Sequence, residues 1–334
     1  MRQFEDKPAV RESVPLLVGL MGPSGSGKTF SALRLATGVQ TVTGGDIYCI
    51  DTESRRALHY ADTFKFRHIP FDAPFGSLDY LAAIRHCVEK GAKVIVVDSM
   101  THEHTGPGGY LLTQEAELDR MAGTDYAKRE RVKFAAWIKP AHLRQQMITG
   151  ILTLNCNLIF CFRAKEKIKP QRGGEPIAMG FMPVAGEELL FEMTVNMLLL
   201  PKAGGVPSWR SDHVGEKLMM KLPKYFEDIF QQVGPLDEAI GKRLAEWARG
   251  GPVRRADTHP AAPTSSPPQE IPQDVGADNY EDSEALIEEE TRLVEAAQSG
   301  QQHLRDAWLS IPKERRKDPR LIAVKDRLKR ETVG

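Results

Sequence analysis

The chain has 334 residues, of which 41% are hydrophobic and 27% are charged, a composition typical of one or two globular domains with additional segments. Its 45 basic and 45 acidic residues balance, which excludes a basic field over the whole molecule and leaves only local patches for nucleic acid. The N-terminal segment lacks the apolar stretch of a secretory signal, and no run approaches the roughly 20 apolar residues of a membrane helix. We therefore expect a cytoplasmic protein with no membrane partner.

Apolar runs rich in β-branched residues alternate with helical segments between residues 16 and 200, the pattern of a mostly parallel sheet covered by helices. The pattern predicts an α/β fold. The expected strands are Leu16–Met21, Ile47–Ile50, Phe66–Phe71, Val94–Val97, Leu158–Phe162 and Thr194–Leu200. The expected helices are Thr29–Gly38, Ser77–Lys90, Tyr110–Met121 and Phe134–Thr149.

Two further elements complete the expected core. Met197–Leu200 and Lys217–Leu222 flank a glycine-containing loop and are predicted to pair as a hairpin at the sheet edge. Pro235–Arg249 has apolar residues along one helical face and is followed by two glycines, which predicts a last helix. The core would then span residues 14–250, after an N-terminal extension of residues 1–13.

The composition changes after Gly250. Six prolines lie between Pro252 and Pro272, and acidic residues dominate between Glu270 and Glu290, so we expect a Pro-rich acidic linker over residues 251–282. Apolar residues at helical spacing then predict a small helical appendage over residues 283–334.

The four cysteines lack the CxxC spacing of a zinc or redox site. Three of them lie in apolar, strand-like runs, which favours buried free thiols over disulfides in a reducing compartment. The four cysteines are Cys49, Cys87, Cys156 and Cys161.

A glycine-rich segment between the first expected strand and the first expected helix fits the phosphate-binding pattern G-x-x-x-x-G-K-[ST]. Glycines let backbone N–H groups turn toward phosphate oxygens, and the following helix directs the positive end of its dipole at the same anion. The lysine would neutralise the β- and γ-phosphates of ATP, and the threonine hydroxyl would bind Mg²⁺. The residues are Gly22, Pro23, Ser24, Gly25, Ser26, Gly27, Lys28 and Thr29.

Acidic residues follow two of the expected strands. Asp98 ends the buried strand Val94–Val97, as an aspartate that supports magnesium does in the Walker B pattern. The next residue is Ser99, so a glutamate that polarises water must come from elsewhere. Glu53 follows the second strand, at the edge where nucleotides bind in open α/β sheets, and we favour it for this catalytic role. Glu103 is the alternative.

These segments resemble the RecA family, with GPSGSGKT at residues 22–29, DTE at 51–53 and VIVVDS at 94–99. The resemblance covers about residues 14–230 and implies a RecA-like P-loop NTPase core in which Glu53 is catalytic. The segment after Asp98, with GPGG at residues 106–109, is similar to short phage-encoded RecA-core ATPases that accompany single-strand annealing and single-strand DNA-binding proteins. Where RecA proper carries a glutamine sensor after the fifth strand, this sequence has Phe162 and Arg163.

Basic residues mark the segments expected to contact DNA or a neighbouring subunit. After the fifth strand, basic side chains outnumber acidic ones, and the resemblance implies a mobile loop here that faces DNA through salt-sensitive phosphate contacts. The candidate DNA contacts are Lys165, Lys167, Lys169 and Arg172. The resemblance also implies a site at a subunit interface, where the neighbour donates a cation. The candidates for this finger in trans are Lys217, Lys221, Lys224 and Arg163.

These basic segments also allow interpretations that involve neither DNA nor a neighbouring subunit. The lysine-rich segments equally suit exposed edge strands that discourage aggregation. A further basic stretch is more consistent with a solubilising helix face than with DNA binding, and its residues are Lys128, Arg129, Arg131 and Lys133.

The sequence thus predicts an ATPase of DNA recombination or repair, encoded by a phage or prophage, that forms a ring or filament on single-stranded DNA. ATP and Mg²⁺ are its expected cofactors, and a single-strand annealing or DNA-binding protein is its expected partner. Two alternatives remain: a replicative-helicase-like or packaging motor built on the same core, and a nucleotide-switched adaptor with little turnover.

Overall fold

The computed structural model describes residues 6, 9, 12–170, 176–231, 234–250, 293, 296, 301–312, 316 and 319–331. The chain divides into two compact units, Met1–Ala256 and Asp257–Gly334. The predicted linker over residues 251–282 lies outside the described residues.

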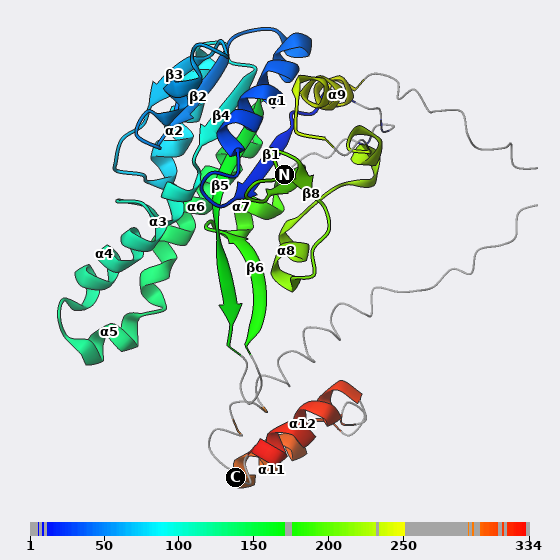
Figure 1. Ribbon diagram of the computed structural model, residues 1–334. Helices are drawn as coiled ribbons and strands as arrows, with labels where there is room; N and C mark the ends of the chain where they lie inside the picture. Colours follow the sequence, from blue (N-terminus) through cyan, green and yellow to red (C-terminus); the bar gives the residue numbers. More distant parts are fainter. Residues whose placement is uncertain are drawn as a thin grey trace, which may run out of the picture. The chain divides into compact units, whose positions relative to one another are not determined.

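A mostly parallel sheet forms the centre of the first unit (Figure 1). Its strands lie in the order β3-β2-β4-β5-β1-β7-β8, and all neighbours from β3 to β7 are parallel. β8 pairs antiparallel with β7, and β6 pairs antiparallel with the outer half of β5. The strands are β1 (Leu17–Gly22), β2 (Ile47–Asp51), β3 (Arg67–Pro70), β4 (Val94–Asp98), β5 (Asn157–Lys169), β6 (Ile177–Pro183), β7 (Val195–Leu199) and β8 (Pro207–Ser208).

Helices cover both faces of this sheet, with α1 and α9 packed together on one face and α2 and α6 on the other. The arrangement confirms the predicted α/β class with a mostly parallel central sheet. The α-helices of the unit are α1 (Lys28–Thr43), α2 (Ser77–Glu89), α3 (Thr101–Thr105), α4 (Tyr110–Ala122), α5 (Tyr126–Val132), α6 (Ile138–Leu152), α7 (Glu187–Phe191), α8 (Val214–Met219) and α9 (Glu238–Ala248). Three short 3₁₀ helices are η1 (Arg56–Tyr60), η2 (Ala135–Trp137) and η3 (Lys224–Ile229).

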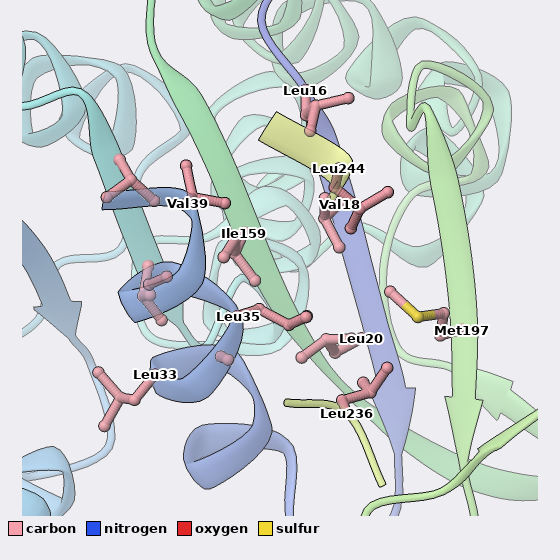
Figure 2. Close-up of a cluster of buried hydrophobic side chains, with 14 of the residues drawn as sticks. Leu16, Val18, Leu20, Leu33, Leu35, Val39, Ile159, Met197, Leu236 and Leu244 are labelled. Carbon is pink, nitrogen blue, oxygen red and sulfur yellow. The ribbon is translucent and has the colours of Figure 1, made fainter. Parts of the chain in front are cut away.

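Alternation along the strands builds two layers of core. Val18 and Leu20 of β1 pack in the layer of α1 and α9, whereas Leu17 and Met21 pack in the opposite layer. Successive strand residues point to opposite faces, so a continuous apolar run is what a strand buried on both faces requires. Figure 2 shows the first layer, in which Leu35 of α1 lies against the β1 side chains. All six predicted strands correspond to observed ones; this explains those buried on both faces, whereas β3 is a partly exposed edge strand.

β5 is longer than the sequence analysis predicts. The expected strand ends at Phe162, but β5 continues to Lys169 and forms a hairpin with β6 that projects from the sheet (Figure 1). A second projection is the arm formed by α4 and α5 (Figure 1). The outer half of β5 alternates lysines with other residues, and this alternation suits a strand exposed to solvent as well as it suits a loop.

The predicted hairpin between Met197–Leu200 and Lys217–Leu222 is wrong. β7 pairs with β8 instead, and Lys217 lies in helix α8. Lys221 makes only a single antiparallel bridge, to Asn196.

A tertiary contact accounts for helix α8. Glu216 is buried and accepts a hydrogen bond of 2.6 Å from the backbone N–H of Phe181 in β6. This contact joins residues 35 positions apart, so the local hydrophobic pattern does not contain it.

The second unit is helical where it is described. It contains α11 (Gln301–Ser310) and α12 (Pro319–Glu331). Their apolar residues form a small core of their own, made of Leu293, Leu304, Ile311, Leu321 and Leu328.

All four cysteines are free and buried. This agrees with the predicted thiols. Among the helices that the structure describes, none combines the length and the apolar character needed to cross a membrane.

Candidate nucleotide-binding site

The glycine-rich segment forms a loop between the end of β1 and the start of α1. Gly25 and Gly27 have φ of 77° and 86°, a backbone conformation that glycine adopts far more readily than other residues. α1 has 16 residues and begins at Lys28, so its unpaired N–H groups face the loop. A loop of this kind at a helix N-terminus is a binding site for phosphate.

Lys28 lies inside this loop. Its Nζ donates hydrogen bonds to the backbone oxygens of Gly22 (2.9 Å) and Pro23 (2.8 Å). Burial lowers the pKa of Lys28, although nearby acidic groups including Asp98 partly oppose the shift. The side chain is therefore a cation with little water around it, which favours an anionic ligand.

Thr29 and Asp98 meet at the side of the loop. The Thr29 hydroxyl donates a hydrogen bond of 2.5 Å to Asp98 Oδ2 at the end of β4. Burial raises the pKa of Asp98 to about 6, against the opposing effect of the Thr29 hydrogen bond. A buried carboxylate beside a hydroxyl offers the hard oxygen ligands that Mg²⁺ prefers, and a divalent ion would stabilise its charge. These residues therefore fit a magnesium site.

The opposite side of the site is formed by Glu53 and Arg163. Arg163 Nε donates to Glu53 Oε1 at 2.7 Å, and a second guanidinium nitrogen contacts Glu53 Oε2. Burial alone would raise the pKa of Glu53, but the hydrogen bonds and charge of Arg163 outweigh it, so the pKa lies below its usual value. Glu53 is ionised and its side chain is only 10% exposed.

Strand register brings these groups together although they are far apart in sequence. Gly22 of β1 pairs with Arg163 of β5, and Asp51 of β2 pairs with Asp98 of β4. The carboxyl ends of these parallel strands therefore share one edge, where ligands bind in open α/β sheets.

A cavity of about 140 Å³ joins the two sides of the site. Two of its lining residues, Arg56 and Tyr60 of η1, were missed by the sequence analysis. Tyr60 also packs near Phe30, with ring centroids 5.8 Å apart. The only sequence signal for them is that they follow Glu53 by a few residues. The full lining is Ser24, Gly25, Gly27, Lys28, Thr29, Glu53, Arg56, Tyr60, Asp98 and Arg163.

Glu103, the alternative to Glu53, lies elsewhere. Its carboxylate accepts hydrogen bonds from Ser77 (2.6 Å) and from Arg144 (2.8 and 3.2 Å), and it is 3% exposed. It does not line the cavity described above. The geometry therefore favours Glu53 and gives Glu103 a structural ion pair.

The remaining candidates occupy three places. Lys165, Lys167 and Lys169 are exposed on the outer half of β5, and Arg172 lies outside the described residues. Among the proposed finger residues, the ammonium group of Lys221 is held by the backbone oxygens of its own chain at Phe191 and Met193. Lys217 and Lys224 are exposed on α8 and at the start of η3.

Residues 15–197 match the model of the AAA domain family, over more than half of the chain. The matched region includes the phosphate loop and all the residues that line the cavity. The chain belongs to this family of P-loop ATPases. No curated protein matches the chain.

Proposed function

We propose that the protein is a RecA-like ATPase, encoded by a phage or prophage, that acts on single-stranded DNA in recombination or repair in the cytoplasm of the host. The family supports nucleotide hydrolysis, and the pocket brings together Lys28, Thr29, Asp98 and Glu53. The DNA part of the proposal rests on the β5–β6 hairpin.

Different residues of the pocket have separate roles in the proposed hydrolysis of ATP. The loop N–H groups and Lys28 bind the β- and γ-phosphates of ATP, while Thr29 and Asp98 hold Mg²⁺. When bound, the ion neutralises charge that develops on the phosphate oxygens. Glu53 accepts a hydrogen bond from the attacking water and orients it. Tyr60 offers an aromatic face against which a base can pack.

The hairpin lysines share one face, and this observation carries the DNA proposal. Lys165, Lys167 and Lys169 alternate with other residues along β5, so their side chains point the same way. Lys167 pairs across the ladder with Gly180, and a side chain on Gly180 would collide with Glu216 of α8. Gly180 lies at a β-bulge, and the backbone N–H of Phe181 donates to Glu216, so α8 lies along the outer edge of β6.

Lys217 is exposed on α8, which packs against β6 of the same hairpin. A row of amines on a projecting hairpin suits the phosphates of a flexible strand and does not read bases. The same strand β5 carries Arg163 into the nucleotide pocket, so the proposed DNA surface and the nucleotide site share a continuous element.

We further propose a ring or filament of identical subunits, in which Lys217 or Lys224 approaches the nucleotide of a neighbour. Within the chain Arg163 already contacts Glu53, which favours a role for Arg163 in its own subunit. A single-strand annealing or DNA-binding protein is the proposed partner.

Fluorescence anisotropy of a labelled oligothymidylate tests the DNA proposal, over a series of salt concentrations. Each phosphate contact contributes about 0.7 to the slope of log affinity against log salt for single strands, so the triple variant K165A/K167A/K169A should lower the slope by about 2. The matched control K128A/R131A/K133A removes three positive charges from the arm and should leave the slope near the wild-type value.

Turnover is measured in parallel without DNA, with single-stranded DNA and with duplex DNA. The proposal requires single-stranded DNA to raise wild-type turnover more than duplex DNA does. Equal losses of affinity in the two triple variants, or no binding of the wild type at low salt, would contradict it. Directional unwinding of a forked duplex would indicate a motor, and tight ATP binding with negligible turnover under all conditions would indicate an adaptor.

A further inference from the structure

We propose that Asp51 is a positioning residue whose buried carboxylate holds the turn that carries Glu53 into the nucleotide pocket. The inference rests on the role of Glu53 proposed above. Asp51 ends β2 and its side chain is fully buried, yet it does not line the pocket.

Three donors converge on the Asp51 carboxylate. Oδ1 accepts the backbone N–H of Glu53 at 2.8 Å, and Oδ2 accepts the backbone N–H of Ala57 at 2.9 Å. The Nε2 atom of His68 on the neighbouring strand β3 lies 3.1 Å from Oδ2. The carboxylate therefore holds both ends of the turn between residues 53 and 57, while His68 holds the carboxylate.

The turn that Asp51 holds is strained. Ser54 and Arg55 have φ of 58° and 65°, in the left-handed region, although neither is glycine. Two successive side chains in this region persist only where the surrounding structure enforces them. The hydrogen bonds to Asp51, on both sides of the pair, are the observed restraint.

The stem of the turn is also fixed to β4. The backbone N–H of Thr52 donates to the backbone oxygen of Asp98 at 2.8 Å. The Thr52 hydroxyl accepts the N–H of Ser99 (2.9 Å) and donates to the Ser99 oxygen (3.0 Å). Thr52 is hydrogen-bonded to the end of β4, and the backbone N–H groups of Glu53 and Ala57 are hydrogen-bonded to Asp51. The turn therefore sets Glu53 at a fixed place relative to the proposed metal ligand, Asp98.

A positioning role differs from a purely structural one in what it does to turnover. Displacing a catalytic group by a small distance can cost about 10²-fold in rate. Asp98 is the strand partner of Asp51, but neither the Asp98 side chain nor the phosphate loop hydrogen-bonds the Asp51 carboxylate, so nucleotide binding should change less than turnover. Losing the hydrogen bonds to the Asp51 carboxylate should therefore lower kcat more than it raises KM.

The test measures kcat and KM for Mg-ATP without DNA, with thermal unfolding of each variant, on the full-length chain. Asp51→Asn keeps the shape but places an N–H₂ group where carboxylate oxygens accepted hydrogen bonds. We expect D51N to lower kcat at least about tenfold and to change KM less than about threefold. S54G/R55G is the matched control, and we expect it to stay within about threefold of the wild type, because glycine adopts positive φ without strain.

The combined variant D51N/S54G/R55G provides the decisive readout. If Asp51 acts by enforcing the strained turn, the two glycines remove the strain and should restore kcat at least about threefold over D51N. Wild-type kcat in D51N, or a loss that the glycines do not recover, would overturn the proposal. If D51N does not fold, His68→Ala with and without the same glycines takes its place, and the same two outcomes decide.

E53Q separates this proposal from the one on which it rests. If E53Q hydrolyses ATP like the wild type, the role of Glu53 is wrong. If E53Q is inactive while D51N is fully active, only the role of Asp51 is wrong.

Discussion

The two sides of the nucleotide pocket are built in different ways. The phosphate-loop side comes from eight successive residues, Gly22–Thr29, whose identities and spacing define the structure locally. The other side depends on Glu53 and Arg163, which are 110 positions apart and meet only because β2 and β4 end beside the middle of β5. A binding surface for phosphate can therefore be predicted from a short motif, whereas bringing Glu53 and Arg163 together requires the fold.

The largest expected effect is on the phosphate-loop side. Lys28→Ala removes the cation that two loop oxygens hold in place, so Mg-ATP binding should fall below detection in calorimetry, and turnover by about 10³-fold or more. Lys65→Ala removes an exposed lysine outside the pocket and should behave like the wild type. Wild-type affinity of K28A for Mg-ATP would contradict the role proposed for the phosphate loop.

Glu103→Gln tests whether the catalytic carboxylate is Glu53 or Glu103. Glu103 is buried in an ion pair with Arg144, so removing its charge leaves the buried guanidinium with only the exposed Glu188, 3.7 Å away, as an acidic partner; breaking a buried pair typically costs about 3–5 kcal/mol of stability. Urea unfolding should show this loss, while turnover per folded molecule stays near the wild-type value. A stable E103Q protein without turnover would move the catalytic role from Glu53 to Glu103.

Asp98→Asn should stabilise the protein when nucleotide and Mg²⁺ are absent. Because the pKa of Asp98 is raised from its usual 3.8 to about 6, ionisation disfavours the folded state, and this effect grows as pH rises from about 4 through about 6. At pH 8 the substitution should add about 1–3 kcal/mol of stability, and at pH 5, midway between the two pKa values, about half of that gain should remain. Unfolding curves in EDTA at the two pH values measure this; equal gains at both would contradict the role of burial.

Arg163→Met tests the interaction between Arg163 and Glu53, and its expected effect is the smallest of these substitutions. Arg163 holds the pKa of Glu53 below its usual value against the opposing effect of burial, so removing the charge should raise that pKa. Since a base must be ionised to accept a proton, the acidic limb of the pH profile of kcat/KM should move to higher pH. An unchanged acidic limb would show that the limb does not report Glu53.

The sequence predicts most of the α/β core because each central strand is a continuous apolar run that must be buried on both faces. It also predicts Lys28, Thr29 and Asp98, whose roles follow from local motifs. The helix α8 could not be predicted, because it depends on the contact between Glu216 and β6. The contacts of Asp51 were missed for the same reason, since they join β2 to η1 and β3.

The role proposed for Glu53 could be predicted only in part from the sequence. The sequence places Glu53 after a strand and leaves Glu103 as a rival, and only the fold shows that one lines the pocket while the other is paired with Arg144. The projecting hairpin is a similar case, because its lysines are visible in the sequence but their common face depends on the pairing of β5 with β6.

The most direct test of the account is to compare Mg-ATP binding with single-turnover hydrolysis in Glu53→Gln. The substitution keeps the size of the side chain but removes the carboxylate that we propose orients water. We predict affinity within about threefold of the wild type and hydrolysis slower by about 10²–10⁴-fold. Hydrolysis by E53Q at the wild-type rate would contradict the central claim that this carboxylate, which the fold brings to the phosphate loop, acts on the water.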